Sequence, residues 1–96
     1  MIKIVAKNYI KADKVQEIIA LAKKLVQETI QKDKGCIRYE LFQDLSNPQI
    51  LTFIEEWENK EALDCHMSAK HFKEIVPYVA ECSEKTGETS LYQKLA

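Results

Sequence analysis

Glycine and proline are scarce in this chain, with two residues of each among 96. That scarcity excludes collagen-like and linker-rich chains and favours long, uninterrupted secondary structure. An excess of charge of one sign is also missing, because 14 basic and 15 acidic residues leave a net charge of −1. No tract is strongly basic, so the chain has no electrostatic footprint for a nucleic-acid partner.

Long hydrophobic runs are absent as well. None approaches the roughly 20 residues that a membrane-spanning helix needs, so no membrane partner is expected. The first residues are strand-like and show no secretory signal peptide. Cys36, Cys65 and Cys82 are odd in number and widely spaced, which disfavours a disulfide framework or a zinc knuckle and fits reduced thiols in the cytoplasm. A single domain over residues 1–96 is expected.

The hydrophobic pattern predicts strands at both ends and helices between. Residues 2–10 alternate like a strand. From Val15 to Ile30 the apolar residues recur at helical spacing over about five turns, and Gly35 suits a left-handed cap that ends this helix. Residues 36–42 and 50–57 are strand-like and joined by a short turn, which indicates an antiparallel hairpin.

The second half of the chain adds one helical region and one strand. Asn59 can cap a helix over residues 60–67, Ser68 can cap a second segment, and Pro77 is expected to kink that segment or mark its restart. Gly87 opens a last strand over residues 89–95. The order β-α-β-β-α-β predicts an α+β, ferredoxin-like fold with a four-stranded antiparallel sheet.

Alternation sorts the strand residues onto two faces of this sheet. The face expected under the helices carries Ile4, Ala6, Asn8, Ile37, Tyr39, Leu41, Leu51, Phe53, Glu55, Trp57, Leu91 and Leu95. The other face mixes charged residues with large apolar ones and is less polar than a face in water should be. Its apolar residues are Val5, Tyr9, Cys36, Phe42, Ile50, Ile54 and Tyr92, and its charged ones Lys3, Arg38, Glu40 and Glu56. We therefore expect a homodimer through the open sheet face. Asn8 and Glu55 are the polar exceptions under the helices; each is either a pocket group or a locally satisfied one, Asn8 by its own backbone and Glu55 by a basic residue at the rim.

Both histidines lie in the stretch CHMSAKHF, residues 65–72. In an uninterrupted helix His66 and His71 would lie about 140° apart around the axis and would not converge on one metal ion. A break at Ser68 would make their geometry freer, but no third ligand is evident nearby, so no metal site is predicted. Cys65 and His66 are adjacent and point to different sides, which disfavours a nucleophile–base pair. Acid–base or hydrogen-bonding roles and purely structural roles both stay open for the two histidines.

Three motifs in register resemble the antibiotic biosynthesis monooxygenase family. They are GC-x-x-Y at residues 35–39, E-x-W-x-x-x-x-A-L-x-x-H at residues 55–66, and H-F at residues 71–72. Each motif is weak alone, but together they are fairly specific, and the resemblance covers nearly the whole chain. It implies the same element order as the one predicted above, assembled as a dimeric α+β barrel.

Family members similar to quinol monooxygenases imply an oxidoreductase that uses dioxygen without metal, flavin, haem or nicotinamide. The implied substrate is a quinol or polyphenol, which is deprotonated and then transfers electrons to dioxygen. The resemblance implies His66 as the base and Asn8 as the group that orients the substrate, with His71 as a further catalytic candidate. Its pocket wall is expected from Tyr39, Phe53, Glu55, Trp57 and Phe72. A histidine at a pocket wall adds little to a core, so His66→Ala is expected to leave the fold intact.

Two other branches of the family give alternatives. A haem-degrading branch has a strand asparagine that Asn8 matches, but His66 and Val76 stand where that branch has a tryptophan and its iron-binding histidine, which disfavours haem degradation. A third branch, an isomerase of phosphorylated autoinducer catabolism, carries a similar pair of histidines. An isomerase and a non-catalytic small-ligand-binding dimer are therefore the alternatives, and neither implies a cofactor.

Overall fold

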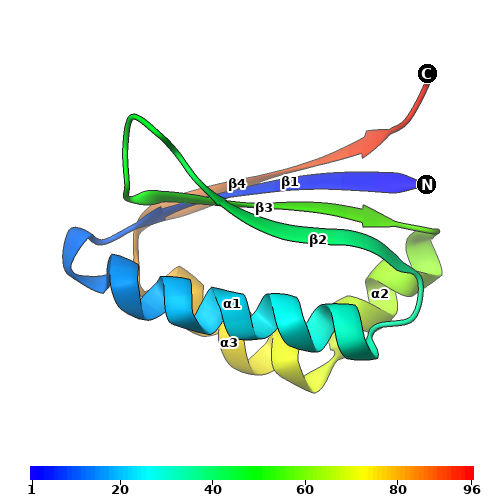
Figure 1. Cartoon of the computed structure of the whole chain (residues 1–96), viewed down its shortest axis with the longest axis horizontal. Helices are drawn as coiled ribbons and strands as arrows, with labels where there is room; N and C mark the ends of the chain where they lie inside the picture. The colour runs from blue at the N-terminus through cyan, green and yellow to red at the C-terminus, as the bar shows by residue number, and fades with distance from the viewer.

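One antiparallel sheet with helices on a single face forms the molecule (Figure 1). The computed structural model describes residues 1–96. The elements, in chain order, are β1 (Ile2–Ile10), a short 3-10 turn (Ala12–Lys14), α1 (Val15–Lys32), β2 (Cys36–Gln43), β3 (Ile50–Trp57), α2 (Lys60–Ser68), α3 (Lys70–Glu81) and β4 (Ser83–Gln93). This order confirms the predicted ferredoxin-like α+β fold.

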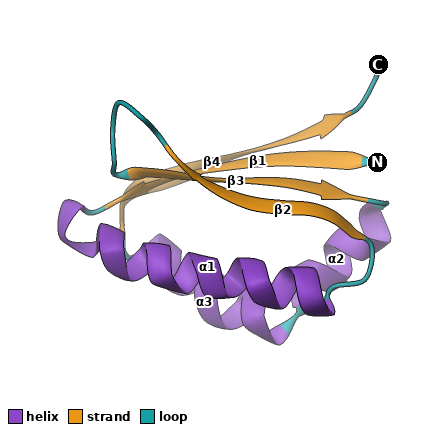
Figure 2. Ribbon diagram, in the orientation of Figure 1, coloured by secondary structure: helices purple, strands orange, loops and turns teal.

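The strands follow the order β2-β3-β1-β4, so β1 and β3 are central and β2 and β4 are edges. The register of the central pair places Ile2 opposite Trp57 and Asn8 opposite Leu51. All three helices lie on the same side of this sheet, and its other side is open (Figure 2). The fold therefore has two layers, with its core between them.

Helix α1 matches its predicted amphipathic pattern. It buries Val15, Ile18, Ala22, Leu25 and Thr29 against the sheet. The helix ends at Lys32, and Asp33 follows as its C-cap residue, with its backbone N–H donating to the Thr29 carbonyl at 3.0 Å. Gly35 has the expected positive φ, 84°, but lies two residues beyond that cap.

The second helical region divides in two at Ala69. Asn59 caps α2 as predicted, accepting a hydrogen bond from the Ala62 backbone N–H at 2.9 Å. The predicted cap at Ser68 is wrong, because Ser68 is still helical and Ala69, in extended conformation (φ −69°, ψ 149°), precedes α3 without a side-chain cap. Helix α3 then continues through Pro77 without restarting.

Two strand assignments need correction. Strand β4 begins at Ser83, not near Gly87. The predicted start is too late because the first half of the strand is exposed and polar and shows no apolar alternation. A register shift lies between Cys36 and Arg38 in β2. It turns Cys36 toward the core and leaves Ile37 52% exposed, the reverse of the predicted faces. Leu91 shares the helix-side face with its partner Ile4 but is 59% exposed, because the helices do not cover this edge strand.

The buried core includes large side chains from the central strands and all three helices. Trp57, Ile10, Leu25 and Leu51 are at most 2% exposed. No helix is long and apolar enough to span a membrane. The three cysteines are free, with Cys82 buried and Cys65 exposed.

Candidate functional site

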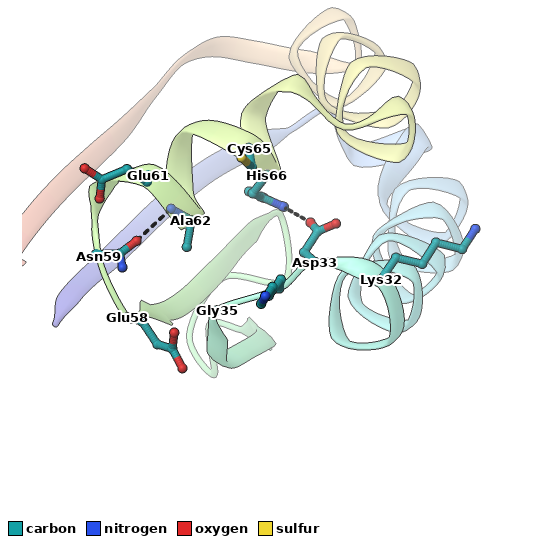
Figure 3. A pocket seen from close by; sticks show the side chains of 10 residues that line it. Lys32, Asp33, Gly35, Glu58, Asn59, Glu61, Ala62, Cys65 and His66 are labelled. Atoms are coloured by element: carbon teal, nitrogen blue, oxygen red, sulfur yellow. Dashed lines mark hydrogen bonds and ion pairs between the residues drawn. The ribbon is translucent and has the colours of Figure 1, made fainter.

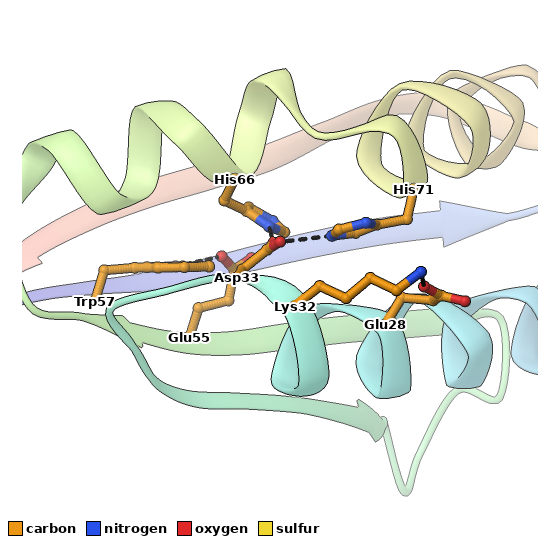
Figure 4. A network of polar contacts seen from close by, with 7 residues as sticks. All are labelled: Glu28, Lys32, Asp33, Glu55, Trp57, His66 and His71. Carbon is orange, nitrogen blue, oxygen red and sulfur yellow. Dashed lines mark hydrogen bonds and ion pairs between the residues drawn. The ribbon is translucent and has the colours of Figure 1, made fainter.

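The break at Ala69 brings both histidines to one carboxylate. His66 lies in the last turn of α2, and His71 lies in the first turn of α3. Because the extended residue between the helices redirects the chain, the 140° separation of an unbroken helix does not apply. The chain does break between the histidines, one residue after the expected Ser68, and the two rings converge. The prediction that no third ligand lies nearby is wrong, because Asp33 meets both of them (Figure 4).

Asp33 accepts from both rings through a single oxygen. Its Oδ2 lies 2.5 Å from His66 Nδ1 and 2.9 Å from His71 Nε2. A carboxylate only accepts hydrogen bonds, which assigns the protons of these bonds to the two ring nitrogens. The three side chains are 8%, 1% and 10% exposed for Asp33, His66 and His71. The cluster therefore lies largely out of water, where each of its hydrogen bonds is strengthened.

Aromatic rings surround His66. Its ring centroid lies 4.5 Å from that of Trp57 and 5.1 Å from those of Tyr39 and Phe72. Its Nε2 is buried and makes no hydrogen bond. Burial lowers the pKa of His66, and the bond to Asp33 opposes that shift only in part. The imidazole is therefore held neutral, with Nδ1–H on Asp33 and a free lone pair on Nε2.

This packing also changes what His66 contributes to stability. A side chain 1% exposed among three aromatic rings belongs to the core, and its truncation would leave a cavity. The expectation that His66→Ala leaves the fold intact therefore loses its basis. A substitution that keeps the volume, such as His66→Gln, is the better probe of chemistry.

A second buried acid lies beside the aromatic rings. Trp57 Nε1–H donates to Glu55 Oε1 at 2.9 Å, so of the two interpretations of Glu55 the partnership with a basic residue at the rim does not hold. Burial raises the pKa of Glu55 to about 7, against the lowering effect of the Trp57 hydrogen bond. Burial also raises the pKa of the nearby Tyr39, and the charge of Glu55 adds to that shift. Cys36, close to Asp33 and Glu55, has its pKa raised to about 11, mainly by burial.

Asp33 lines two clefts. The first, of about 470 Å³, lies between the loop after α1 and helix α2, and its lining includes Asp33, Gly35, Cys65 and His66 (Figure 3). The second, of about 440 Å³, is lined by His71 together with Asp33 and residues of α1 and α3. Asp33 is therefore shared by both openings.

Most of the predicted site residues lie together, but neither cleft beside Asp33 is lined by the predicted wall residues Tyr39, Phe53, Glu55, Trp57 and Phe72. His66 contacts Trp57, Tyr39 and Phe72, and Tyr39 in turn packs on Phe53 with ring centroids 5.5 Å apart. His71 joins the group through Asp33, and Glu55 joins it through Trp57.

Asn8 is the exception. It pairs with Leu51, six positions along β3 from Trp57, which is roughly 20 Å at 3.3 Å per residue. Its side-chain amide donates to the Ala6 and Leu51 carbonyls at 3.2 and 3.3 Å. The structure thus gives Asn8 the backbone-bonding role that was the simpler of its two interpretations.

Asp33 is the site residue that the sequence reasoning missed. One signal was available: Asp33 directly follows the long helix α1, and a carboxylate at a helix C-terminus faces the negative end of the helix dipole. An acid in that place needs a compensating partner. The partners come from positions 33 and 38 residues further along the chain, which no local pattern reveals.

Comparisons with known proteins agree with this fold. Residues 1–78 match the family described as antibiotic biosynthesis monooxygenase. A crystal structure of a conserved protein from Methanosarcina mazei is 48% identical, with a TM-score of 0.93 over 98% of this chain and 92% of that one. A crystal structure described as antibiotic biosynthesis monooxygenase is 31% identical, with a TM-score of 0.94 over the whole of both chains.

An uncharacterized protein from Synechocystis is 32% identical over 84 residues, which cover 88% of this chain. The match covers 56% of that protein, so the chain spans little more than half the length of this relative. The family match extends from β1 into α3 and includes Asp33, both histidines and the aromatic rings around His66. The chain belongs to the antibiotic biosynthesis monooxygenase family.

Proposed function

We propose that this protein is a cofactor-independent monooxygenase that oxidises a quinol or polyphenol with dioxygen, with His66 as its general base. One observation carries the proposal: His66 Nδ1 is held by Asp33, while its Nε2 is left without a partner among aromatic rings. This is the arrangement of a base whose tautomer is fixed by a carboxylate. The family and the relative described as a monooxygenase supply the reaction class.

The proposed reaction begins with transfer of the phenolic proton to Nε2. Asp33 stabilises the imidazolium that forms, and His71 keeps Asp33 in position through its own hydrogen bond. The electron-rich phenolate then reduces dioxygen: one oxygen atom forms a new bond to ring carbon, and the other leaves as water. For a simple quinol, quinol plus dioxygen gives hydroxyquinone plus water, which balances atoms and electrons.

The surroundings of His66 suit this chemistry. Trp57, Tyr39 and Phe72 exclude water from the ring, and burial lowers the pKa of His66, so that the imidazole is neutral and able to accept a proton. Nε2 itself is covered. The proposal therefore requires that the substrate enters through the cleft beside Asp33 and Cys65 and displaces part of its wall.

Oxygen consumption with a panel of hydroquinones tests the proposal. His66→Gln should lower turnover of a responsive quinol by about 10²–10⁴-fold, the usual contribution of general base catalysis. Asp33→Asn should also lower it, because the amide no longer fixes the tautomer or stabilises the imidazolium. Cys65→Ser, in the same cleft but exposed, is the matched control and should retain activity.

The pH profile gives a second readout. Activity of the unmodified protein should rise with pH as the His66 imidazole loses its proton. The ratio of its turnover rate to that of His66→Gln should fall as pH approaches the pKa of the hydroquinone, because the substrate then ionises without a base. A ratio near one at neutral pH, on protein shown by circular dichroism to be folded, would remove His66 from the mechanism.

An isomerase is the second candidate, because two histidines on one carboxylate can also move a proton between two positions of a substrate without dioxygen. Turnover that proceeds equally under nitrogen would favour it. Binding of a quinol without turnover, seen as thermal stabilisation, would instead favour a ligand-binding protein. For each of these functions we propose a cytoplasmic homodimer that closes the open sheet face.

A further inference from the structure

We propose that Asp33, His66 and His71 bind one divalent transition-metal ion. The three side chains offer one carboxylate oxygen and two imidazole nitrogens, and these ligand atoms all lie within 4.8 Å of one another. They come from the end of α1, the last turn of α2 and the first turn of α3 (Figure 4). This inference does not depend on quinol oxidation.

Small movements would bring the Asp33 oxygen to metal-binding separations from both histidine nitrogens, which lie within 4.8 Å of each other. With metal–ligand bonds of about 2.0–2.1 Å, tetrahedral donors lie about 3.3 Å apart. The Asp33 oxygen lies 2.9 Å from His71 Nε2 and 2.5 Å from His66 Nδ1. The first pair would have to separate by roughly 0.4 Å and the second by roughly 0.8 Å. Side-chain rotation can supply both, because Asp33 lies in the loop that follows α1.

The local charges favour a cation at this point. The Asp33 carboxylate is 8% exposed and lies at the C-terminus of an 18-residue helix, where the dipole is negative. Its side chain bonds only the two histidine rings, and no lysine or arginine pairs with it. The lysine next to it, Lys32, is already bound to Glu28 at 2.5 Å. A cation held between the three ligands would offset both the carboxylate charge and the helix dipole.

Metal binding would not add an unsatisfied group. When His66 Nδ1 donates to Asp33, the buried Nε2 is a lone pair without a donor. When Nδ1 binds a metal ion, Nε2 carries the proton and lacks an acceptor. One buried nitrogen of His66 is therefore unpaired with or without the metal ion. Metal binding then adds no further penalty for an unsatisfied buried group.

The donor set indicates which ions would bind. Two imidazoles and one carboxylate suit Zn²⁺ and the other divalent ions of the late first transition series, whereas Mg²⁺ and Ca²⁺ prefer oxygen ligands. Three protein ligands leave a fourth position open.

Occupation of this site would also regulate the proposed activity. An ion on Nδ1 places the proton of His66 on Nε2, which can then no longer accept a phenolic proton. Zn²⁺ should therefore inhibit quinol turnover. Only this regulatory consequence rests on the proposed function; the binding itself does not.

Titration of the full metal-free chain with Zn²⁺ by calorimetry, and with Co²⁺ by visible absorption, tests the site. We expect one ion per chain and a Co²⁺ spectrum of nitrogen and oxygen ligands. His71→Gln and Asp33→Asn should each weaken binding by at least 10–100-fold, since even outer-shell partners of metal ligands contribute that much. Cys65→Ser controls for the free thiol in the same cleft and should bind as tightly as the unmodified chain.

Nitrogen NMR of the unmodified protein makes the test independent of variant folding. Zn²⁺ should shift His66 Nδ1 and His71 Nε2 and place a proton on His66 Nε2. Absence of binding, binding that survives both ligand substitutions, or binding lost in Cys65→Ser would each overturn the proposal. Zn²⁺ binding by a chain that, without metal, oxidises none of the quinols would leave this site standing and refute the proposed function alone.

Discussion

The buried carboxyl of Glu55 makes the stability of the protein depend on pH. Its pKa rises from 4.5 to about 7 on folding because the carboxyl is buried. Between these pH values the unfolded chain has released this proton and the folded chain retains it, so the ionisation favours unfolding as pH rises. At 1.36 kcal/mol for each pH unit, the loss approaches about 3 kcal/mol at pH 7 and above.

Glu55→Gln should remove this dependence while its amide oxygen still accepts from Trp57. The variant should match the unmodified protein below about pH 4.5 and be more stable by up to about 3 kcal/mol above pH 7. His66 acts in the opposite direction, because its pKa is lowered on folding and stability is lost as pH falls through its unfolded value. The His66 effect is common to both proteins and cancels in the difference between their free energies of unfolding. Urea unfolding from pH 4 to 8 measures this difference, and a difference that does not change with pH would contradict the buried-acid assignment.

At the scale of elements, Gly35 fixes the approach of α2 to the start of β2. Its φ is +84°, and a Cβ added there would lie 2.6 Å from Ala62 Cβ. Gly35→Ala should therefore destabilise the protein by about 2–4 kcal/mol, from the left-handed backbone and the overpacking together. Chemical denaturation measures the loss.

A second substitution separates the two causes. In an Ala62→Gly background the steric clash is relieved and the backbone strain persists, so Gly35→Ala should cost less than in the unmodified chain. An equal cost in both backgrounds would show that Ala62 is not what Gly35 accommodates.

The helix–strand order was predictable because it depends on local periodicity. The apolar spacing of α1 and the alternation of β1 and β3 identify each element without tertiary information. Strand β4 was misplaced at its start because residues 83–88 are polar, and only pairing with β1 makes them a strand. The faces of Cys36 and Ile37 were reversed because a register shift leaves no mark in the pattern.

The candidate site was predictable only in part. Motifs and alternation placed His66 near Tyr39, Trp57 and Phe72. The meeting of His66 with His71 depends on the conformation of Ala69, and the sequence pointed to Ser68 instead. The carboxylate between them belongs to Asp33, at the C-terminal end of α1. Its role follows from how the helices pack and not from any local spacing of residues in the sequence.

At the scale of the whole molecule, the open sheet face predicts self-association. Val5 and Ile54 pair across the central strands on this face, where Phe42 and Tyr92 are 48% and 53% exposed. Light scattering at micromolar concentration should find a homodimer. Ile54→Lys should give a monomer, because it places a charge in the centre of the apolar face.

The matched control for this prediction is Ile30→Lys on α1. Ile30 is 60% exposed but lies in the helix layer, so its substitution should leave the dimer intact. A monomeric unmodified protein, or dissociation by both substitutions alike, would contradict assembly through the sheet.

The single carboxylate oxygen of Asp33 has a mechanical consequence. It joins the end of α1 to the end of α2 and the beginning of α3, so three helix termini share one point of attachment. Withdrawal of the α1 end strains both bonds, and withdrawal of α2 or α3 strains its own bond to Asp33, so motions of the three helix ends are coupled. The lengths of the segments on either side are constrained for the same reason. One residue added to or removed from the stretch between His66 and His71 would turn one ring away from Asp33, and that ring's helix would no longer be bonded to the end of α1.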